Sequence, residues 1–144
     1  IDPERNKLPE HLRDLKAPYL TFGMAIVDAC APYVSAFKPQ AAHFAAVGAE
    51  DQLAKLIDYI QTHHPDIPVI LDAKRGDVGS TAALYAKEAF ERYGADAVTV
   101  NPYLGHDSLV PYFQYSDRGV IVLCRTSKPG SDWIHGVRVG EEPL

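Results

Sequence analysis

Two carboxylates and an ammonium group fall close together in this sequence, at Asp72, Lys74 and Asp77. The apolar run at 69–71 precedes them and is typical of a buried strand. Because residues i and i+2 of a strand share one face, we expect Asp72 and Lys74 to point the same way. Lys38 ends the preceding predicted strand, so the four groups form a candidate Lys-Asp-Lys-Asp array.

Such an array is suited to acid–base and electrostatic catalysis. A lysine flanked by two carboxylates stays protonated, because opposite charges stabilise the ammonium group. It can then face developing negative charge and also donate a proton. The alternative is a solvated cluster of salt bridges on a loop. We favour the functional interpretation, because charges that extend a buried strand are seldom kept without a partner or a function.

The elements that must position these residues alternate between strands and helices. The clearest helix is at 51–62, where the apolar residues Leu53, Leu56, Ile57 and Ile60 recur at i, i+3, i+4 and i+7. The predicted helices span 19–33, 51–62, 80–93 and 107–115. The predicted strands span 35–38, 68–74, 97–100 and 120–124. These strands are too apolar for one solvated face, so the pattern predicts an α/β domain with a parallel sheet covered by helices.

Polar residues follow the carboxyl end of each predicted strand. They are Asp2, Lys38, Gln40, Asp72, Lys74, Asn101, Thr126 and Ser127. Enzymes built on closed barrels keep their sites at this rim. An open, doubly wound sheet more often carries a Gly-rich phosphate loop after its first strand, and this sequence has none. The pattern therefore favours a TIM (β/α)8 barrel.

Composition excludes several classes of protein. The 144 residues are 47% hydrophobic and 23% charged, which is typical of a globular domain. The net charge of −5 disfavours a nucleic-acid-binding or lipid-binding role, and no apolar run approaches the ~18 residues of a membrane span. No signal peptide is visible. We expect Cys30 and Cys124 to be buried free thiols, which indicates a reducing, cytoplasmic compartment.

The segment 71–81 resembles the signature of the orotidine 5′-phosphate decarboxylases, specifically a bacterial subgroup that carries Asp-Ala-Lys-Arg-Gly-Asp. Four more segments resemble strand ends of this family. They are Ile-Asp-Pro at 1–3, Ala-Phe-Lys-Pro-Gln at 36–40, the run 97–105 and the run 123–130. Similar segments thus occur in order along essentially the whole sequence. One difference is Lys128, where this subgroup usually has Asn.

The resemblance implies cofactor-free decarboxylation of orotidine 5′-monophosphate to uridine 5′-monophosphate in de novo pyrimidine biosynthesis. It assigns Lys74 as the donor of the proton that replaces carbon dioxide, and Asp72 as the neighbour of the substrate carboxylate. Lys38 would bridge the ribose and the charged array. Without a cofactor as electron sink, such an enzyme must stabilise its transition state electrostatically.

The same resemblance implies further contacts to the nucleotide and to a second subunit. Asp2 would hydrogen-bond the ribose, and Ser127 would contact the pyrimidine. Asp77 would enter the site of the neighbouring subunit of a homodimer, followed across the interface by Val78 and Thr81.

The resemblance also sets an expectation for the domain. A closed barrel typically needs ~250 residues. We therefore expect residues 1–144 to form the N-terminal portion of a single barrel domain, from the end of strand 1 through about strand 5. Strands 6–8, with the phosphate-binding loops that follow strands 7 and 8, would be absent.

Two alternatives stay open. A Mg²⁺-dependent sugar-phosphate decarboxylase or synthase on this fold also carries Asp-x-Lys-x-x-Asp, although no carboxylate lies near Lys38 in its strand. The other alternative is a non-catalytic half-barrel that only binds or assembles. No metal site is predicted, because the adjacent His63 and His64 would point about 100° apart on a helix.

Overall fold

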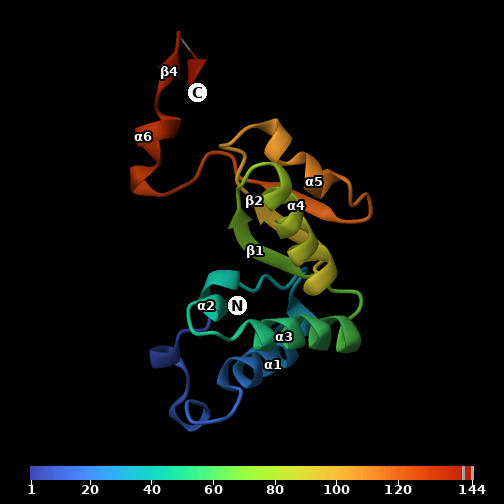
Figure 1. Cartoon of the computed structure of the whole chain (residues 1–144). Coiled ribbons are helices and arrows are strands. Elements are labelled where there is room, and N and C mark those ends of the chain that lie inside the picture. Colours follow the sequence, from blue (N-terminus) through green and yellow to red (C-terminus); the bar gives the residue numbers. More distant parts are fainter. Residues whose placement is uncertain (141, 144) are drawn as a thin grey trace.

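The computed structural model describes residues 1–140 and 142–143. Its central element is a three-stranded parallel sheet in the order β1-β2-β3 (Figure 1). β1 spans Ile70–Arg75, β2 spans Ala97–Val100 and β3 spans Gly119–Val122. The parallel pairing confirms the predicted α/β organisation, and β2 coincides with the predicted strand at 97–100.

The segment predicted as a strand at 35–38 lies beside β1 but is not a continuous strand. It contributes one isolated parallel bridge, Phe37–Val69, and Gln40 just beyond it contributes a second, Gln40–Asp72. Pro39 stands between them and has no N–H to donate to a ladder, so the pairing is interrupted there. Its carbonyl still accepts a hydrogen bond from the Asp72 N–H at 3.0 Å. The predicted strand at 35–38 is therefore wrong, although its position beside β1 is as expected.

Helices connect the strands, as expected for right-handed βαβ units. The longer helices are α1 Pro18–Cys30, α2 Ala41–Ala45, α3 Glu50–His63 and α4 Gly79–Lys87, which continues as a π-helical turn at Glu88–Arg92. The short helices are α5 Val110–Phe113 and α6 Asp132–His135, with 3₁₀ turns at Arg5–Lys7, Glu10–Leu12, Ala31–Tyr33, His106–Ser108 and Pro129–Ser131. Within the described residues, none of these helices has the length and apolar character that a membrane crossing requires.

The predicted helix at 107–115 is divided in two. Pro111 lies in the first turn of α5, where a proline is favoured because that N–H needs no intrahelical acceptor. It therefore begins a new helix and cannot continue the preceding 3₁₀ turn. The other three predicted helices are confirmed as α1 with its following 3₁₀ turn, α3, and α4 with its π-helical turn.

One core cluster joins the sheet to the helices. From α3 it includes the helical repeat that the sequence analysis identified, namely Leu53, Leu56, Ile57 and Ile60, all fully buried. α1 packs on α3, and α4 packs on α5 beside the sheet (Figure 1). Gly23 of α1 permits the close approach to α3, because a Cβ at this position would lie 2.6 Å from Leu56 Cδ2.

β3 forms an open edge of the described sheet. Ile121 and Val122 are apolar yet 42% and 38% exposed. Cys124, just beyond them, is exposed and Cys30 is only partly buried, so the prediction that both thiols are buried is wrong. Cys124 is exposed because no described element covers this edge, whereas Cys30 is the last residue of α1 and packs partly buried against the core. Both thiols are free. α6 and the antiparallel pair of β4 Arg138–Val139 with β5 Glu142–Pro143 extend away from the sheet (Figure 1).

The α1–α3 contact leads to a stability prediction. Gly23→Ala places a methyl group against the buried Leu56, and overpacking of this kind costs about 1–3 kcal/mol. The gain in helix propensity offsets up to about 1 kcal/mol. We expect a net loss of about 1 kcal/mol in the free energy of unfolding, measured by urea denaturation of the whole protein. Gly130→Ala is the matched control, because a Cβ there meets nothing within 4 Å. Equal stability of the two variants would contradict the prediction.

Candidate active site

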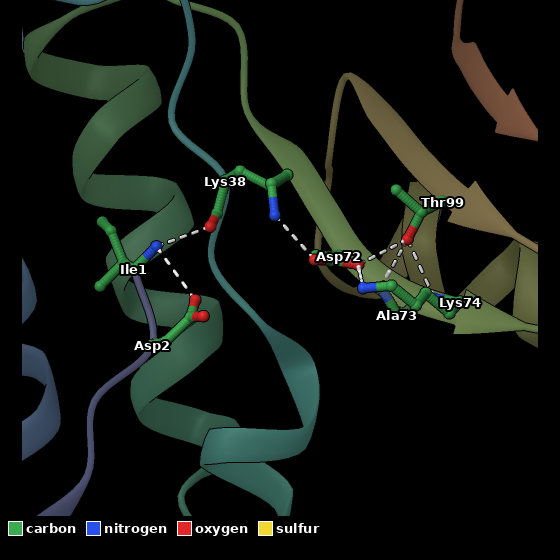
Figure 2. A network of polar contacts seen from close by, with 7 residues as sticks. All are labelled: Ile1, Asp2, Lys38, Asp72, Ala73, Lys74 and Thr99. Carbon is green, nitrogen blue, oxygen red and sulfur yellow. Dashed lines mark hydrogen bonds and ion pairs between the residues drawn. The ribbon is translucent and has the colours of Figure 1, made fainter. Parts of the chain in front are cut away.

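The candidate site lies at the carboxyl ends of the parallel strands, as predicted. Lys38 belongs to the segment beside β1, Asp72 and Lys74 belong to β1, and Thr99 belongs to β2 (Figure 2). Parallel strands end at the same edge of a sheet, so side chains from three neighbouring segments can meet there. We call Lys38, Asp72 and Lys74 the charged triad.

The Asp72 carboxylate is the centre of the charged triad. Its Oδ2 accepts a hydrogen bond from Lys38 Nζ at 2.7 Å, and its Oδ1 accepts one from Lys74 Nζ at 2.5 Å. Thr99 Oγ1 donates a further hydrogen bond to Oδ1 at 2.9 Å. Asp72 is 4% exposed, whereas the side chains of Lys38 and Lys74 are 50% and 48% exposed. A buried anion thus holds two ammonium groups that face open space.

These contacts also determine the ionisation of Asp72. Burial by itself raises the pKa of this carboxyl, because a charged group loses water. The hydrogen bonds from Lys38, Lys74 and Thr99 outweigh burial and lower the pKa from 3.8 to about 2. The carboxylate is therefore fully ionised near neutral pH, and its charge holds the two ammonium groups on either side of it.

Asp72 and Lys74 meet as predicted, but regular strand alternation is not the reason. β1 is bulged, because Leu71 pairs with Val98 and Arg75 pairs with Val100, so three residues of β1 stand opposite one of β2. Lys74 has a φ of +48°, in the left-handed region that side chains rarely adopt. The amide groups of the bulge donate to Thr99 Oγ1.

Asp77, the fourth member of the predicted array, does not join the charged triad. Its Oδ1 accepts a hydrogen bond from the Val78 N–H at 2.8 Å, and its carboxylate forms no ion pair among residues 1–140 and 142–143. Val78 is exposed. Thr81 is half-buried in the first turn of α4, where its N–H donates to the Val78 carbonyl. The structure therefore brings three of the four charged groups together.

Asp2 and Ser127 also lie apart from the charged triad. Asp2 is exposed and lies beside the segment that carries Lys38 (Figure 2). In that segment the Gln40 N–H donates to the Ile1 carbonyl at 3.1 Å. No described contact joins the Asp2 carboxylate to the triad. Ser127 is exposed in the loop after β3.

A pocket of about 420 Å³ lies beyond the carboxyl ends of β2 and β3. Its lining includes Asn101, Tyr103, Leu123, Thr126 and Trp133. Thr126 therefore faces this pocket, whereas its neighbour Ser127 is not among the lining residues. The pocket is largely apolar with a few polar groups and adjoins the strand ends, as is typical of small-molecule sites.

The sequence analysis missed three residues that hold the end of β1 in place. Thr99 is the first, and a threonine in an apolar strand gives no sign of a functional hydroxyl because threonine is common in strands. The other two are Arg75 and Glu88, whose side chains form a bidentate pair with Arg75 Nη2 3.0 Å from Glu88 Oε2. The Arg75 guanidinium also lies 4.4 Å from the centre of the Tyr85 ring. Nothing in the sequence links Arg75 to a partner 13 positions later.

Gly76 follows Arg75 and passes close to the end of β2. A Cβ at this position would lie 3.2 Å from both the Cβ and the carbonyl oxygen of Asn101. The Asn101 N–H donates to the Arg75 carbonyl at 2.7 Å, which fixes the same crossing point. The Arg-Gly pair therefore anchors the start of the loop that carries Asp77.

Comparison with known proteins identifies a family that the chain resembles over most of its length. A model of the family described as "Orotidine 5'-phosphate decarboxylase / HUMPS family" matches residues 20–141. Proteins named orotidine 5′-phosphate decarboxylase from Azoarcus sp. (strain BH72) and Dechloromonas aromatica (strain RCB) are each 58% identical over 144 residues, which is 100% of this chain and 53% of each relative. The chain spans about half the length of the curated relatives it matches.

Solved structures give the same result for the fold. A putative orotidine-monophosphate-decarboxylase from Toxoplasma gondii is 36% identical with a TM-score of 0.90, over 99% of this chain and 49% of that one. Leishmania donovani UMP synthase is 41% identical with a TM-score of 0.82, over 89% of this chain and 28% of that one. The predicted α/β fold, an incomplete TIM (β/α)8 barrel, is confirmed.

The ionisation of Asp72 predicts how stability depends on pH. Its folded pKa of about 2 lies below the ordinary 3.8, so its contribution is fully present above about pH 4 and is lost as the pH falls toward 2. The difference between these two pKa values corresponds to a stabilisation of about 2 kcal/mol at most. Solvent around the half-exposed lysines reduces this stabilisation to about 1 kcal/mol. Between pH 5 and pH 2.5, we expect the wild-type whole protein to lose that much more stability than Asp72→Asn, measured by urea denaturation.

Asp58→Asn is the matched control for this experiment. Asp58 is exposed on α3 and forms no ion pair among the described residues. We expect this variant to follow the wild type over the same pH range. The prediction is wrong if Asp72→Asn and the wild type lose equal stability.

Proposed function

The chain belongs to the orotidine 5′-phosphate decarboxylase / HUMPS family, and on that premise we propose that the whole protein decarboxylates orotidine 5′-monophosphate to uridine 5′-monophosphate in pyrimidine biosynthesis. The charged triad at the strand ends is the observation that carries this proposal. Its two ammonium groups are held on one buried carboxylate and face open space, as a site for an anionic substrate and transition state requires.

The proposed reaction uses these groups in a simple sequence. The bond between the pyrimidine ring and its carboxylate breaks, carbon dioxide leaves as a neutral molecule, and the electron pair stays on the ring carbon. The Lys74 ammonium group faces that developing charge and then transfers a proton to the same carbon. Lys38 adds positive charge on the ribose side. Asp72 holds both ammonium groups in place, and we assign less weight to its repulsion of the substrate carboxylate.

We assign substrate contacts to Asp2 and Ser127 within the same proposal. Support for Asp2 is its position beside the segment that carries Lys38, on the side assigned to the ribose. Support for Ser127 is the pocket beyond β2 and β3, which its neighbour Thr126 lines. The pyrimidine would occupy this pocket, and Ser127 would contact it from the same loop.

A homodimer in which Asp77 crosses to the neighbouring site is also proposed. The support is that the Asp77 carboxylate is bound only by the adjacent Val78 N–H among the described residues. Its neighbour Val78 is apolar and 54% exposed, and Leu84 of the following α4 is 66% exposed. Thr81 lies in the first turn of α4. Such a surface is suited to a second subunit.

A cytoplasmic location belongs to the proposal as well, since both cysteines are free thiols.

Residues 1–144 are proposed to be the N-terminal portion of a single barrel domain. The support is that the chain spans about half of its curated relatives, and that the apolar edge of β3 lacks a covering element among the described residues. Strands 6–8 would close the barrel against that edge and supply the phosphate-binding loops. The 144-residue piece alone would then be inactive.

Lys74→Ala tests the reaction directly. We expect turnover to fall by at least roughly 1000-fold in the whole protein, because both the proton donor and a facing positive charge are removed. The measurement follows the change in pyrimidine absorbance as orotidine 5′-monophosphate is consumed. Lys55→Ala, at an exposed position of α3, is the matched control and should retain wild-type turnover. A near-normal rate in Lys74→Ala would rule out the proposed role.

The shared site is tested by mixing inactive variants. Lys74→Ala and Asp77→Ala subunits should form hybrid dimers with one intact site, so a random mixture should regain about a quarter of wild-type activity. Lys74→Ala mixed with Asp72→Asn is the matched control. Because Lys74 and Asp72 meet within one chain, that mixture should regain none. Native mass spectrometry verifies subunit exchange, and exchanged dimers that stay inactive in the first mixture would contradict a shared site.

A further inference from the structure

The bulge in β1 converges on one side-chain hydroxyl, that of Thr99 in β2. The N–H groups of Ala73 and Lys74 both donate to Thr99 Oγ1 at 3.0 Å (Figure 2). The hydroxyl donates its own hydrogen to Asp72 Oδ1 at 2.9 Å. A threonine hydroxyl has one donor and two acceptor positions, so every position is used.

This hydroxyl replaces part of a backbone ladder. Three residues of β1, Asp72 to Lys74, stand opposite Thr99 alone. The Asp72 N–H donates to the Pro39 carbonyl, so the N–H groups of Ala73 and Lys74 are the two that Thr99 Oγ1 binds on the β2 side. Thr99 is 7% exposed, which leaves water little access to these amide groups. Without Thr99 Oγ1, the N–H groups of Ala73 and Lys74 would lie in a part-buried position without a protein acceptor.

The same hydroxyl influences where the Lys74 side chain points. Lys74 has a φ of +48°, a conformation that persists only where the surroundings stabilise it. Its N–H is held by Thr99 Oγ1, and its Nζ is held by Asp72 Oδ1, the atom to which Thr99 also donates. Both ends of the Lys74 residue therefore depend on Thr99, one directly and one through Asp72.

We propose that Thr99 is a positioning residue: its hydroxyl locks the bulge of β1 and so fixes the Lys74 ammonium group against Asp72. The catalytic consequence rests on the proposed function, whereas the structural role does not. Packing alone does not explain the hydroxyl, because a valine would fill the same space in a strand that is otherwise Ala97, Val98 and Val100.

Two substitutions at this position separate the hydroxyl from the methyl group. In the whole protein, we expect Thr99→Val to lower kcat on the order of 100-fold with little change in KM, because the reacting ammonium group is misplaced. Thr99→Ser keeps the hydroxyl and should restore kcat to within about threefold of the wild type. Thr21→Val is the matched control, because that hydroxyl lies exposed on α1 and bonds only the Ala17 carbonyl.

Amide hydrogen exchange measured by NMR gives a readout that needs no activity. We expect the Ala73 and Lys74 amides to exchange more than about tenfold faster in Thr99→Val, and to stay protected in Thr99→Ser. If the wild type is inactive on orotidine 5′-monophosphate, the proposed function fails while exchange still tests Thr99. The inference is overturned if Thr99→Val keeps wild-type kcat and protection, or if Thr99→Ser loses protection or turnover. The serine result decides the question even if the valine variant does not fold.

Discussion

A buried carboxylate must be fully paired, and in this molecule that requirement falls on Asp72. Leaving an ionised group without partners in the interior would cost several kcal/mol. The partners come from three separate segments, because Lys38 lies beside β1, Lys74 lies on β1 and Thr99 lies on β2. The requirement therefore links the position of each segment to the others, and the sheet order of this part of the chain places all three at one edge.

The cost of this arrangement is local irregularity in β1. A bulge and a left-handed lysine would weaken an ordinary strand, but here both faces of the irregular segment are held. Thr99 binds its amides on one side. Beyond the bulge, Arg75 pairs with Glu88 and stacks on Tyr85, which ties the strand end to α4 and its π-helical turn. The charged triad thus stands on a rigid support, as electrostatic catalysis without reorganisation requires.

Other parts of the proposed site face outward from this support. Asp77, Val78 and the edge of β3 present charged and apolar groups to space that no described element fills. In the proposed enzyme, a second subunit and the remaining strands of the barrel occupy that space. Under this proposal, residues of one chain position Lys74, and the second subunit and the remaining strands enclose it.

The sequence alone determined the α/β organisation, the helical repeat of α3, the limits of β2 and the position of the charged residues at strand ends. These features follow from periodicity and local chemistry, which are properties of short segments. It did not predict that Pro39 limits the pairing beside β1 to isolated bridges, that Cys124 is exposed, or that Asp77 stands apart from the triad. It also did not reveal Thr99, because a hydroxyl becomes a structural acceptor only when another strand brings its amides within reach. Only the tertiary structure decides such contacts, since they join residues far apart in the chain.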